Sequence, residues 1–394
     1  MRRQFMGSTL LLVVLLLTGC SQPSSSKPTS SSKAHVTTSS VTSSKSSSAS
    51  QSEQLPSVQR FATTAPVLTT QTKALASFIA AHMLTSQGGI NTNYLDSGET
   101  KDVATGHEWL SESSGLYLQY LAQTDQADAF SRFYQQTKTI FWQQNQFSYR
   151  YDARTNKRYP VNASVDDLRI MRSLLMMAAN HPEDQQWVKE AWRIYHAFAT
   201  KGNSSGNLVD YFDTKTGKQA PEITLCYLDL STLRYFETDA QYQMQLNRLK
   251  NGLISAERPL FEQRYSYQSK TYNHQTTLNS VESLLSAVQL AGVNALPETT
   301  ITWLKAQVSG KKLVNAYTRT GQPASKDQSA AVYALAAQIG RLVGDQTLYK
   351  QALDRAFAFQ INTKESSLNG ALGDATTQTV YSFDNLMTLV IATA

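Results

Sequence analysis

The chain has 394 residues, of which 41% are hydrophobic and 10% aromatic, and its formal net charge is +6. Five basic residues and one acidic residue fall within the first 59 positions, so the rest of the chain carries only about +2. This weak charge excludes the concentrated basic surface of nucleic-acid-binding domains, and we expect no nucleic-acid partner.

The first predicted element is a lipoprotein signal peptide over residues 1–19. A basic start at residues 1–3 precedes an apolar run at 10–17, which is too short for a bilayer span of about 20 residues. The sequence Leu-Thr-Gly-Cys at positions 17–20 resembles the lipobox of bacterial lipoproteins. That resemblance implies cleavage before Cys20, diacylglycerol on its sulfur and a position on the extracellular face of the cell membrane. The alternative is a plain secreted protein with a free thiol at Cys20.

A tether and one large domain follow the signal peptide. Residues 20–59 are dominated by Ser and have almost no large apolar side chains, so this segment is predicted to be disordered. Residues 60–394 contain no second linker of this composition, which favours a single domain. Cys226 is the only cysteine of that domain and lies in an apolar stretch, so we expect a buried thiol without a disulfide partner.

Short extended stretches followed by polar turns recur along the domain. One residue marks each stretch: Tyr94, Tyr149, Tyr211, Tyr265, Tyr317 and Gly370. Successive marker residues are 55, 62, 54, 52 and 53 residues apart, and a regular period of this length indicates a repeat fold.

Two helical patterns lie between successive stretches, the first apolar on nearly every face and the second amphipathic. The apolar helices are expected inside, at about 106–123, 165–180, 223–237, 277–292, 326–343 and 382–394. Their amphipathic partners are expected outside, at about 71–86, 126–144, 183–200, 239–255, 297–308 and 345–360. Six helical hairpins that close into a ring surround the inner helices, so the predicted fold is an all-α (α/α)6 toroid with short β-like turns at its rim. All inner helices should begin at one mouth, where a ligand cleft is expected.

The predicted first inner helix carries a candidate proton donor. Thr105 and Glu108 fit a capping box, whereas Glu112 is expected beyond the first turn, among apolar neighbours. Burial raises the pKa of a carboxyl group. A general acid that works near neutral pH requires such a raised pKa, because it must still hold its proton there. Glu112 is therefore a candidate general acid, and the alternative is a structural acid in a salt bridge.

The predicted second inner helix begins with two adjacent acids, Asp166 and Asp167, followed by Arg169. These carboxylates are the best second member of an acid/base pair at the mouth where Glu112 also lies. Acids in a first helical turn also stabilise the helix dipole, so spacing alone does not choose between the two interpretations.

Aromatic residues are frequent in the rim stretches. Flat rings with a polar edge suit the faces and hydroxyls of pyranose sugars, although about half of these rings are expected to serve packing only. The residues expected to contact a sugar are Tyr94, Trp109, Tyr149, Arg169, Tyr211 and His274.

Two motifs resemble those of a known enzyme family. Ser-Glu-Ser-Ser-Gly at 111–115 is similar to the Ser-Glu-Gly-Gln motif of family 8 glycoside hydrolases, and Ala-Ser-Val-Asp-Asp-Leu-Arg-Ile at 163–170 is similar to their Ala-Ser/Thr-Asp-Ala/Gly-Asp-Leu-Asp-Ile signature. The resemblance spans about residues 70–394. It implies an (α/α)6 fold, inversion of configuration and Glu112 as the general acid. The first Asp of the signature is replaced by Val165 and a later one by Arg169.

The same resemblance implies a catalytic base on or before the fourth inner helix, where many family members have an aspartate. Residues 265–285 contain no aspartate. Asp166, Asp167 or Glu282 would therefore have to serve as the base, because inversion needs a second carboxylate that activates water.

The leading hypothesis is a surface-anchored hydrolase that cleaves a β-linked exopolysaccharide, in which Glu112 protonates the leaving oxygen and Asp166 or Asp167 activates water or holds the sugar. The absent base motivates a second hypothesis, a polysaccharide-binding lipoprotein without turnover. A polysaccharide lyase is disfavoured, because the sequence has no basic cleft pattern that would hold uronates. Metal-ligand spacings, phosphate loops and dinucleotide motifs are absent from the sequence, so we expect no metal and no cofactor. We expect a monomer.

Overall fold

The computed structural model describes residues 56–96, 104–202 and 206–394. The predicted signal peptide at 1–19, the lipidation site Cys20 and the tether as far as residue 55 lie outside the described residues. Within the described ranges, no helix combines the length and the apolar character that crossing a bilayer requires.

The domain is mainly helical, as predicted, and the described residues form twelve α-helices. The helices predicted to lie inside correspond to α2 (Ser111–Gln123), α4 (Ser164–Asn180), α6 (Leu230–Phe236), α8 (Ser280–Ala291), α10 (Ala330–Leu342) and α12 (Ser382–Ala392). The helices predicted to lie outside correspond to α1 (Thr70–Phe78), α3 (Ala127–Phe141), α5 (Gln186–Gly202), α7 (Asp239–Lys250), α9 (Glu298–Ser309) and α11 (Gln346–Phe357).

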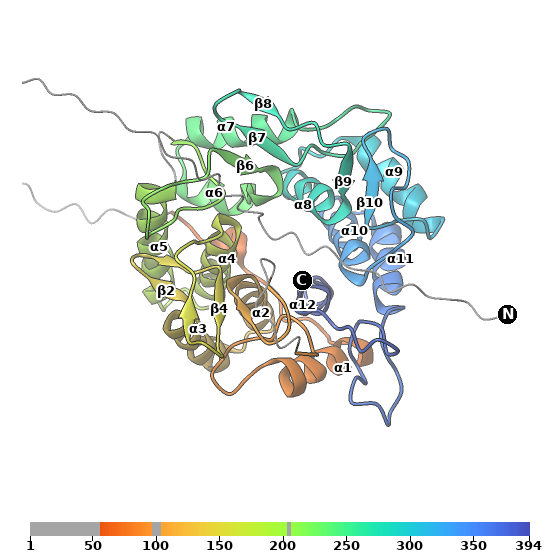
Figure 1. Cartoon of the computed structure of the whole chain (residues 1–394), viewed down its shortest axis with the longest axis horizontal. Helices are drawn as coiled ribbons and strands as arrows, with labels where there is room; N and C mark the ends of the chain where they lie inside the picture. The colour runs from red at the N-terminus through yellow and green to blue at the C-terminus, as the bar shows by residue number, and fades with distance from the viewer. Residues whose placement is uncertain (1–55, 97–103, 203–205) are drawn as a thin grey trace, which may run out of the picture.

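The six inner helices follow one another around a ring. α2 packs against α4 and α12, and α10 packs against α8 and α12. Between α4 and α8, the ring is completed by α6 and the short 3-10 helix η4 (Leu225–Tyr227). The other helices lie on the outside, with α3 against α2, α5 against α4 and α11 against α10 (Figure 1).

Small residues allow these helices to approach closely. A Cβ atom on Gly340 of α10 would lie 2.5 Å from the backbone nitrogen of Tyr349 on α11, closer than such atoms can pack. A Cβ on Gly115 of α2 would lie 3.0 Å from Cβ of Arg169 on α4. The α2–α4 contact, which brings the candidate site together, is therefore tight enough that glycine is the residue that fits there.

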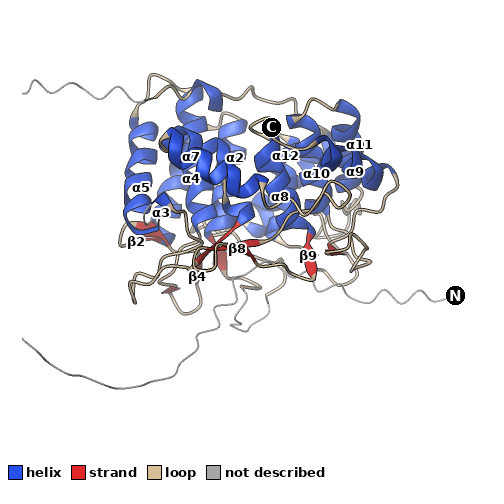
Figure 2. Cartoon of the chain, turned by 90° about the horizontal axis from the view of Figure 1, so that it is seen from above, coloured by secondary structure: helices blue, strands red, loops and turns tan. Residues whose placement is uncertain are grey.

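Short antiparallel strands link neighbouring repeats at one end of the helices (Figure 2). One sheet joins β1 (Trp109–Leu110), β4 (Arg150–Asp152) and β5 (Lys157–Arg158), and another joins β6 (Glu222–Thr224), β7 (Arg264–Ser266) and β8 (Thr271–Tyr272). The remaining pairs are β2 (Trp142–Gln143) with β3 (Gln146–Phe147), and β9 (Thr277–Asn279) with β10 (Ala316–Thr318). Because α2 starts directly after β1, and α8 directly after β9, these inner helices begin at the strand end of the ring.

The segment that follows the tether lies at the opposite end. Thr63 donates its backbone N–H to the side chain of Asn180 at the end of α4 (3.0 Å), and its hydroxyl to the carbonyl of Ala122 near the end of α2 (3.5 Å). Phe61 is buried, with its ring 5.7 Å from that of Tyr235. The chain therefore enters the domain beside the C-terminal ends of α2 and α4, away from the strands.

The core is apolar on all sides of the ring, and Cys226 lies within it as a buried free thiol, as predicted. The most deeply buried ion pair among the described residues joins Glu108, just before α2, to Arg150 of β4. Their side chains are 0% and 1% exposed, and Arg150 Nη2 lies 2.7 Å from Glu108 Oε1. Glu108 Oε2 accepts from the backbone N–H of Thr105 at 3.1 Å, as predicted for a capping box, but α2 begins only at Ser111, so the pair does not cap that helix.

We expect Glu108→Gln to lower the free energy of unfolding by about 3–5 kcal/mol, because it removes the negative charge that lies 2.7 Å from the buried guanidinium of Arg150. Urea denaturation followed by circular dichroism measures the loss. Arg193→Gln is the matched control, since it removes a 41% exposed partner of Glu190 on the outer helix α5 and should cost far less. Equal losses in the two variants would contradict this account of the pair.

Candidate active site

Glu112 is the second residue of α2 and lies at the strand end of the ring. The expectation that it lies beyond the first turn is wrong, because the helix begins five residues later than the predicted start at 106. Its side chain is 23% exposed, so it is partly open to solvent although protein surrounds it. Burial raises the pKa of Glu112 to about 7; the charge of Arg169 opposes this shift and that of Asp166 adds to it.

Arg169 joins Glu112 to Asp166. Its Nη1 atom lies 3.4 Å from Glu112 Oε2 on the neighbouring helix and 2.8 Å from Asp166 Oδ1 on its own helix. The hydroxyl of Ser111 donates to the other oxygen of Asp166 at 2.8 Å. Burial also raises the pKa of Asp166, while Arg169 and Ser111 oppose the shift. We call these three residues the Glu112–Arg169–Asp166 cluster.

Asp167 takes no part in the Glu112–Arg169–Asp166 cluster. It accepts a hydrogen bond of 2.6 Å from the side-chain amide of Asn162, whose own oxygen accepts from the backbone of Phe212. Burial raises the pKa of Asp167 to about 8, so this carboxyl group holds its proton at neutral pH. The structure therefore separates the two adjacent acids that sequence spacing could not tell apart, and only Asp166 lies beside Glu112.

The separation between Glu112 and Asp166 bears on the reaction type. Because both carboxylates contact the same nitrogen, at 3.4 and 2.8 Å, their nearest oxygens lie closer together than the about 6.5–9.5 Å typical of inverting glycosidases. A water molecule and a sugar ring do not fit in line between them. Asp166 is better suited to holding a sugar hydroxyl or orienting Arg169 than to activating water.

Glu282, the third residue of α8, is a buried acid at the same end of the ring. Its Oε2 atom has no hydrogen-bond partner among the described residues. Burial raises the pKa of Glu282 to about 7, against the opposing charge of Arg264. An unpaired carboxyl oxygen on the fourth inner helix matches the position at which the family resemblance implies a base.

Asp210 is a buried rim acid that the sequence analysis missed. Its side chain accepts from the backbone N–H of Thr224 at 2.5 Å and from the Thr224 hydroxyl at 2.7 Å, and burial raises its pKa to about 7. Its backbone carbonyl accepts from Ser164 at the start of α4. Asp210 directly precedes Tyr211, in a stretch whose sequence predicts a turn. Its burial becomes apparent only from the packing of that turn against β6.

Four of the predicted sugar-contacting residues lie around the strand end, partly exposed. Tyr149 stands next to the start of α2, because its carbonyl accepts from Ser111 at 3.1 Å. Tyr94 donates to Ser367 at 3.1 Å, and Tyr211 follows the buried Asp210. His274, which is 62% exposed, lies 2.8 Å from Glu262 through Nδ1. They occupy different parts of the rim, and of the four only Tyr149 bonds to the residue that precedes Glu112.

Trp109 does not face the mouth. It is 4% exposed, donates from its ring nitrogen to Asn91 at 3.1 Å and stacks on Tyr151 with ring centroids 5.3 Å apart. The expectation that it contacts a sugar is therefore corrected, because both faces of the ring are used for packing. Gly89 lies against one of them, where an added Cβ would be 2.0 Å from the indole.

No family model matches the chain. The chain is 26% identical over 319 residues to YdaJ of Bacillus subtilis (strain 168), named as a predicted lipoprotein, over 79% of this chain and 84% of that one. A structure described as a novel alpha-amylase from Clostridium perfringens superposes with a TM-score of 0.75 and 29% identity, covering 82% of this chain and 97% of that chain.

Family 8 glycoside hydrolases share the fold at lower identity. A cold-adapted family 8 xylanase matches with a TM-score of 0.58 and 10% identity, over 83% of this chain and 90% of that chain. The endoglucanase Cel10 of Klebsiella pneumoniae, described as a family 8 glycosyl hydrolase, matches with a TM-score of 0.55 and 14% identity, over 81% and 97%. The resemblance seen in the two motifs is thus confirmed at the level of the fold: the chain is a divergent structural relative of the family 8 glycoside hydrolases.

Proposed function

We propose that this protein is a glycoside hydrolase that acts on a polysaccharide at the strand end of an (α/α)6 toroid, with Glu112 as the general acid. The observation that carries the proposal is that Glu112, which matches the family's acid motif, is partly open to solvent and has a pKa that burial raises to about 7. The ring of inner helices and the fold of the solved relatives support the toroid. Because one fold hosts many activities, the site carries more weight than the architecture.

The Glu112–Arg169–Asp166 cluster suits proton donation to a glycosidic oxygen. Below about pH 7 the protonated Glu112 can give its proton to the leaving oxygen as the bond to the anomeric carbon breaks. The carboxylate that results then faces the guanidinium of Arg169, which stabilises the new negative charge. Asp166 fixes Arg169 from the other side and, in this proposal, holds the sugar.

We assign the activation of water to Glu282 and remove Asp167 from that role. A base must accept a proton, and each of these acids has one buried oxygen without a hydrogen-bond partner among the described residues. The choice between them rests on the higher pKa of Asp167, about 8, and on the bond that its other oxygen accepts from Asn162. Glu282 has an unpaired oxygen at the strand end and lies on a different inner helix from Glu112. The proposal requires the two carboxyl groups to stand about 6.5–9.5 Å apart, with the water between them. Burial raises the pKa of Glu282 to about 7. The deprotonated form, which can accept a proton from water, therefore predominates only above about pH 7.

The expected substrate is a β-linked exopolysaccharide, and the xylanase and endoglucanase relatives support that linkage. A second candidate is an α-linked glucan, which the 29% identity to an alpha-amylase favours. Both candidates use the same acid.

We further propose that the domain is lipid-anchored through Cys20 on the extracellular face of the cell membrane. The Leu-Thr-Gly-Cys sequence at 17–20 and the lipoprotein name of the Bacillus relative support this anchor. The chain enters the domain at the end opposite the strands, so the anchor leaves the proposed catalytic mouth unobstructed.

Glu112→Gln should abolish most turnover, lowering kcat by about 10²–10⁴-fold on the substrate that the wild type cleaves, because the proton donor is lost while the fold remains. Release of reducing sugars from amylose, xylan, mixed-linkage β-glucan, chitosan and acetylated aminoglycans identifies the linkage. Full activity of the variant would remove Glu112 from the acid role. Binding without any product in the wild type would favour the polysaccharide-binding lipoprotein instead.

The pH dependence of kcat/KM should have an alkaline limb near pH 7, because activity needs protonated Glu112 and is lost as pH rises through its pKa. Asp166→Asn removes a negative charge that raises this pKa, so the limb should move to lower pH. Asp167→Asn is the matched control, since Asp167 is already neutral there and faces away, and should leave the limb in place. Equal shifts in the two variants would contradict the proposed cluster.

A further inference from the structure

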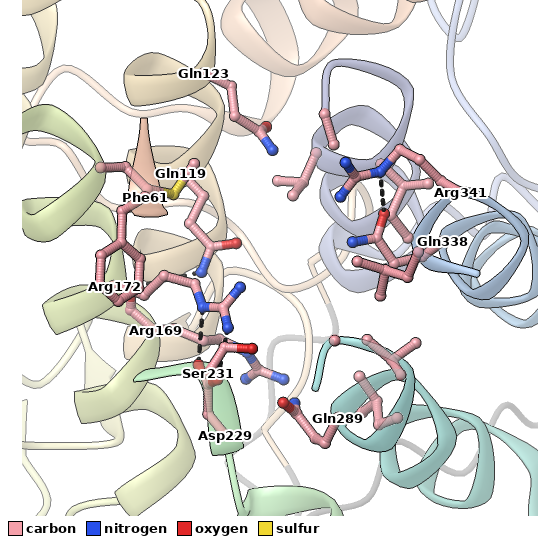
Figure 3. A pocket seen from close by; sticks show the side chains of 18 of the residues that line it. Phe61, Gln119, Gln123, Arg169, Arg172, Asp229, Ser231, Gln289, Gln338 and Arg341 are labelled. Carbon is pink, nitrogen blue, oxygen red and sulfur yellow. Dashed lines mark hydrogen bonds and ion pairs between the residues drawn. The ribbon is translucent and has the colours of Figure 1, made fainter. Parts of the chain in front are cut away.

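A cavity of about 650 Å³ lies inside the ring, between the inner helices. It runs from Arg169 and Val165 on α4 to Gln123 at the end of α2, and residues 60–64 bound it at the end opposite the strands. Figure 3 shows polar side chains pointing into this space from several helices. Neither Glu112 nor Asp166 lines it, and Arg169 is the one member of the Glu112–Arg169–Asp166 cluster that borders it, so the cavity extends from the proposed catalytic mouth towards the opposite end of the ring.

The charged residues that line the cavity are unbalanced. Among the described residues, five arginines and one acid line it. The arginines are Arg60, Arg169, Arg172, Arg234 and Arg341, and the acid is Asp229. The sequence analysis expected no basic cleft, and this cavity corrects that expectation.

Three of the five arginines already have carboxylate partners. Arg172 lies 2.6 Å from Asp229 Oδ1 and donates through Nε to Oδ2 at 2.9 Å. Thr232 donates to the same two oxygens, so Asp229 has no lone pair left for another cation. Arg234 pairs with Asp239. Arg169, as described above, belongs to the Glu112–Arg169–Asp166 cluster.

Arg341 and Arg60 have no carboxylate partner within the described ranges. Arg341 points into the cavity from the last turn of α10, and its Nε donates to Gln338 at 3.2 Å, which leaves the two outer nitrogens towards the open space (Figure 3). Arg60 lies over the rings of Phe61 and Tyr235, at 5.1 and 5.6 Å from their centroids. Ala394 also lines the cavity, without an ion pair to either arginine in this structure.

Arg341 and Arg60 each lie close enough to Arg172 for its positive charge to act on them. Burial lowers the pKa of Arg341, and the positive charge of Arg172 acts in the same direction. Burial likewise lowers the pKa of Arg60, with the charges of Arg234 and Arg172 adding to it. Cations that repel one another in a partly desolvated space would be stabilised by a bound anion.

We propose that this cavity binds a phosphate group on a small polar ligand, held by Arg341, whose outer nitrogens face the space. Guanidinium binds phosphate oxygens through paired donors, and the excess of arginines over acids in the lining favours a doubly charged phosphate monoester over a singly charged carboxylate. The amide side chains of Gln119, Gln289 and Gln338 point into the same space and suit the hydroxyls of the group that carries the phosphate (Figure 3). The volume accommodates a ligand of the size of a sugar phosphate.

Two sources could supply such a phosphate group. One is a free phosphate ester, and the other is a phospholipid headgroup, because residues 60–64, which follow the tether, border the cavity. The two share the same recognition chemistry, and the experiment distinguishes them.

Calorimetric titration of the purified domain with inorganic phosphate and with glucose 6-phosphate tests the free source, with glucose as the uncharged control. Sedimentation with vesicles of phosphatidylcholine and phosphatidylglycerol tests the lipid source, against vesicles of phosphatidylcholine alone. Arg341→Gln should weaken binding by roughly tenfold or more, since a charge-assisted hydrogen bond is lost. Arg193→Gln, which removes the same charge from the outer helix α5, should bind as the wild type does.

Binding of either phosphate source that Arg341→Gln weakens and Arg193→Gln preserves supports the site, and the arm that responds names the source. If the free phosphate ester is the source, glucose 6-phosphate should also raise the Tm of the wild type and leave that of Arg341→Gln unchanged. Absence of binding in both arms, or equal binding by both variants, would overturn the proposal. The readouts are independent of hydrolysis, so failure of the proposed catalytic function would leave this test unaffected.

Discussion

The contact between Arg169 and two carboxyl groups is the interaction on which the candidate site depends. It joins Glu112 of α2 to Asp166 of α4, at a place where Gly115 lets the two helices approach closely. Burial favours the protonated form of each acid, and the shared cation favours the charged form of each. Because the groups interact, the pair titrates as a unit, and one proton remains available near neutral pH. That proton is what a general acid needs.

Acidic and basic side chains inside the ring lie at opposite ends of the inner helices. Acids such as Glu112 and Glu282 lie in the first turns of inner helices, at the strand end, where free backbone N–H groups favour negative charge. Arg234 and Arg341 lie in the last turns of α6 and α10, where the opposite helix ends favour cations. The closed ring thus has an acidic mouth at one end and a basic cavity towards the other, and Arg169 lies between the two.

Periodicity predicted the helices well, because an inner helix must be apolar on every face and the repeat fixes its spacing. The start of α2 was placed too early, since the short strand before Ser111 is apolar as well and continues the pattern. Spacing could not separate Asp166 from Asp167, which point to different neighbours only once α2 and β3 pack around α4. The basic cavity was unpredictable, because arginines as far apart as Arg60 and Arg341 meet only when the ring closes.

The central claim is that Glu112 holds a proton near neutral pH while its side chain is partly open to solvent. Carbon-13 NMR of the protein labelled at the glutamate side-chain carboxyl carbon, with Glu112→Gln to assign the resonance, follows its titration directly. The account predicts a midpoint near pH 7. A midpoint at the ordinary glutamate value of about 4.3 would contradict it, because Glu112 would then be ionised at every pH at which a neutral-pH hydrolase works.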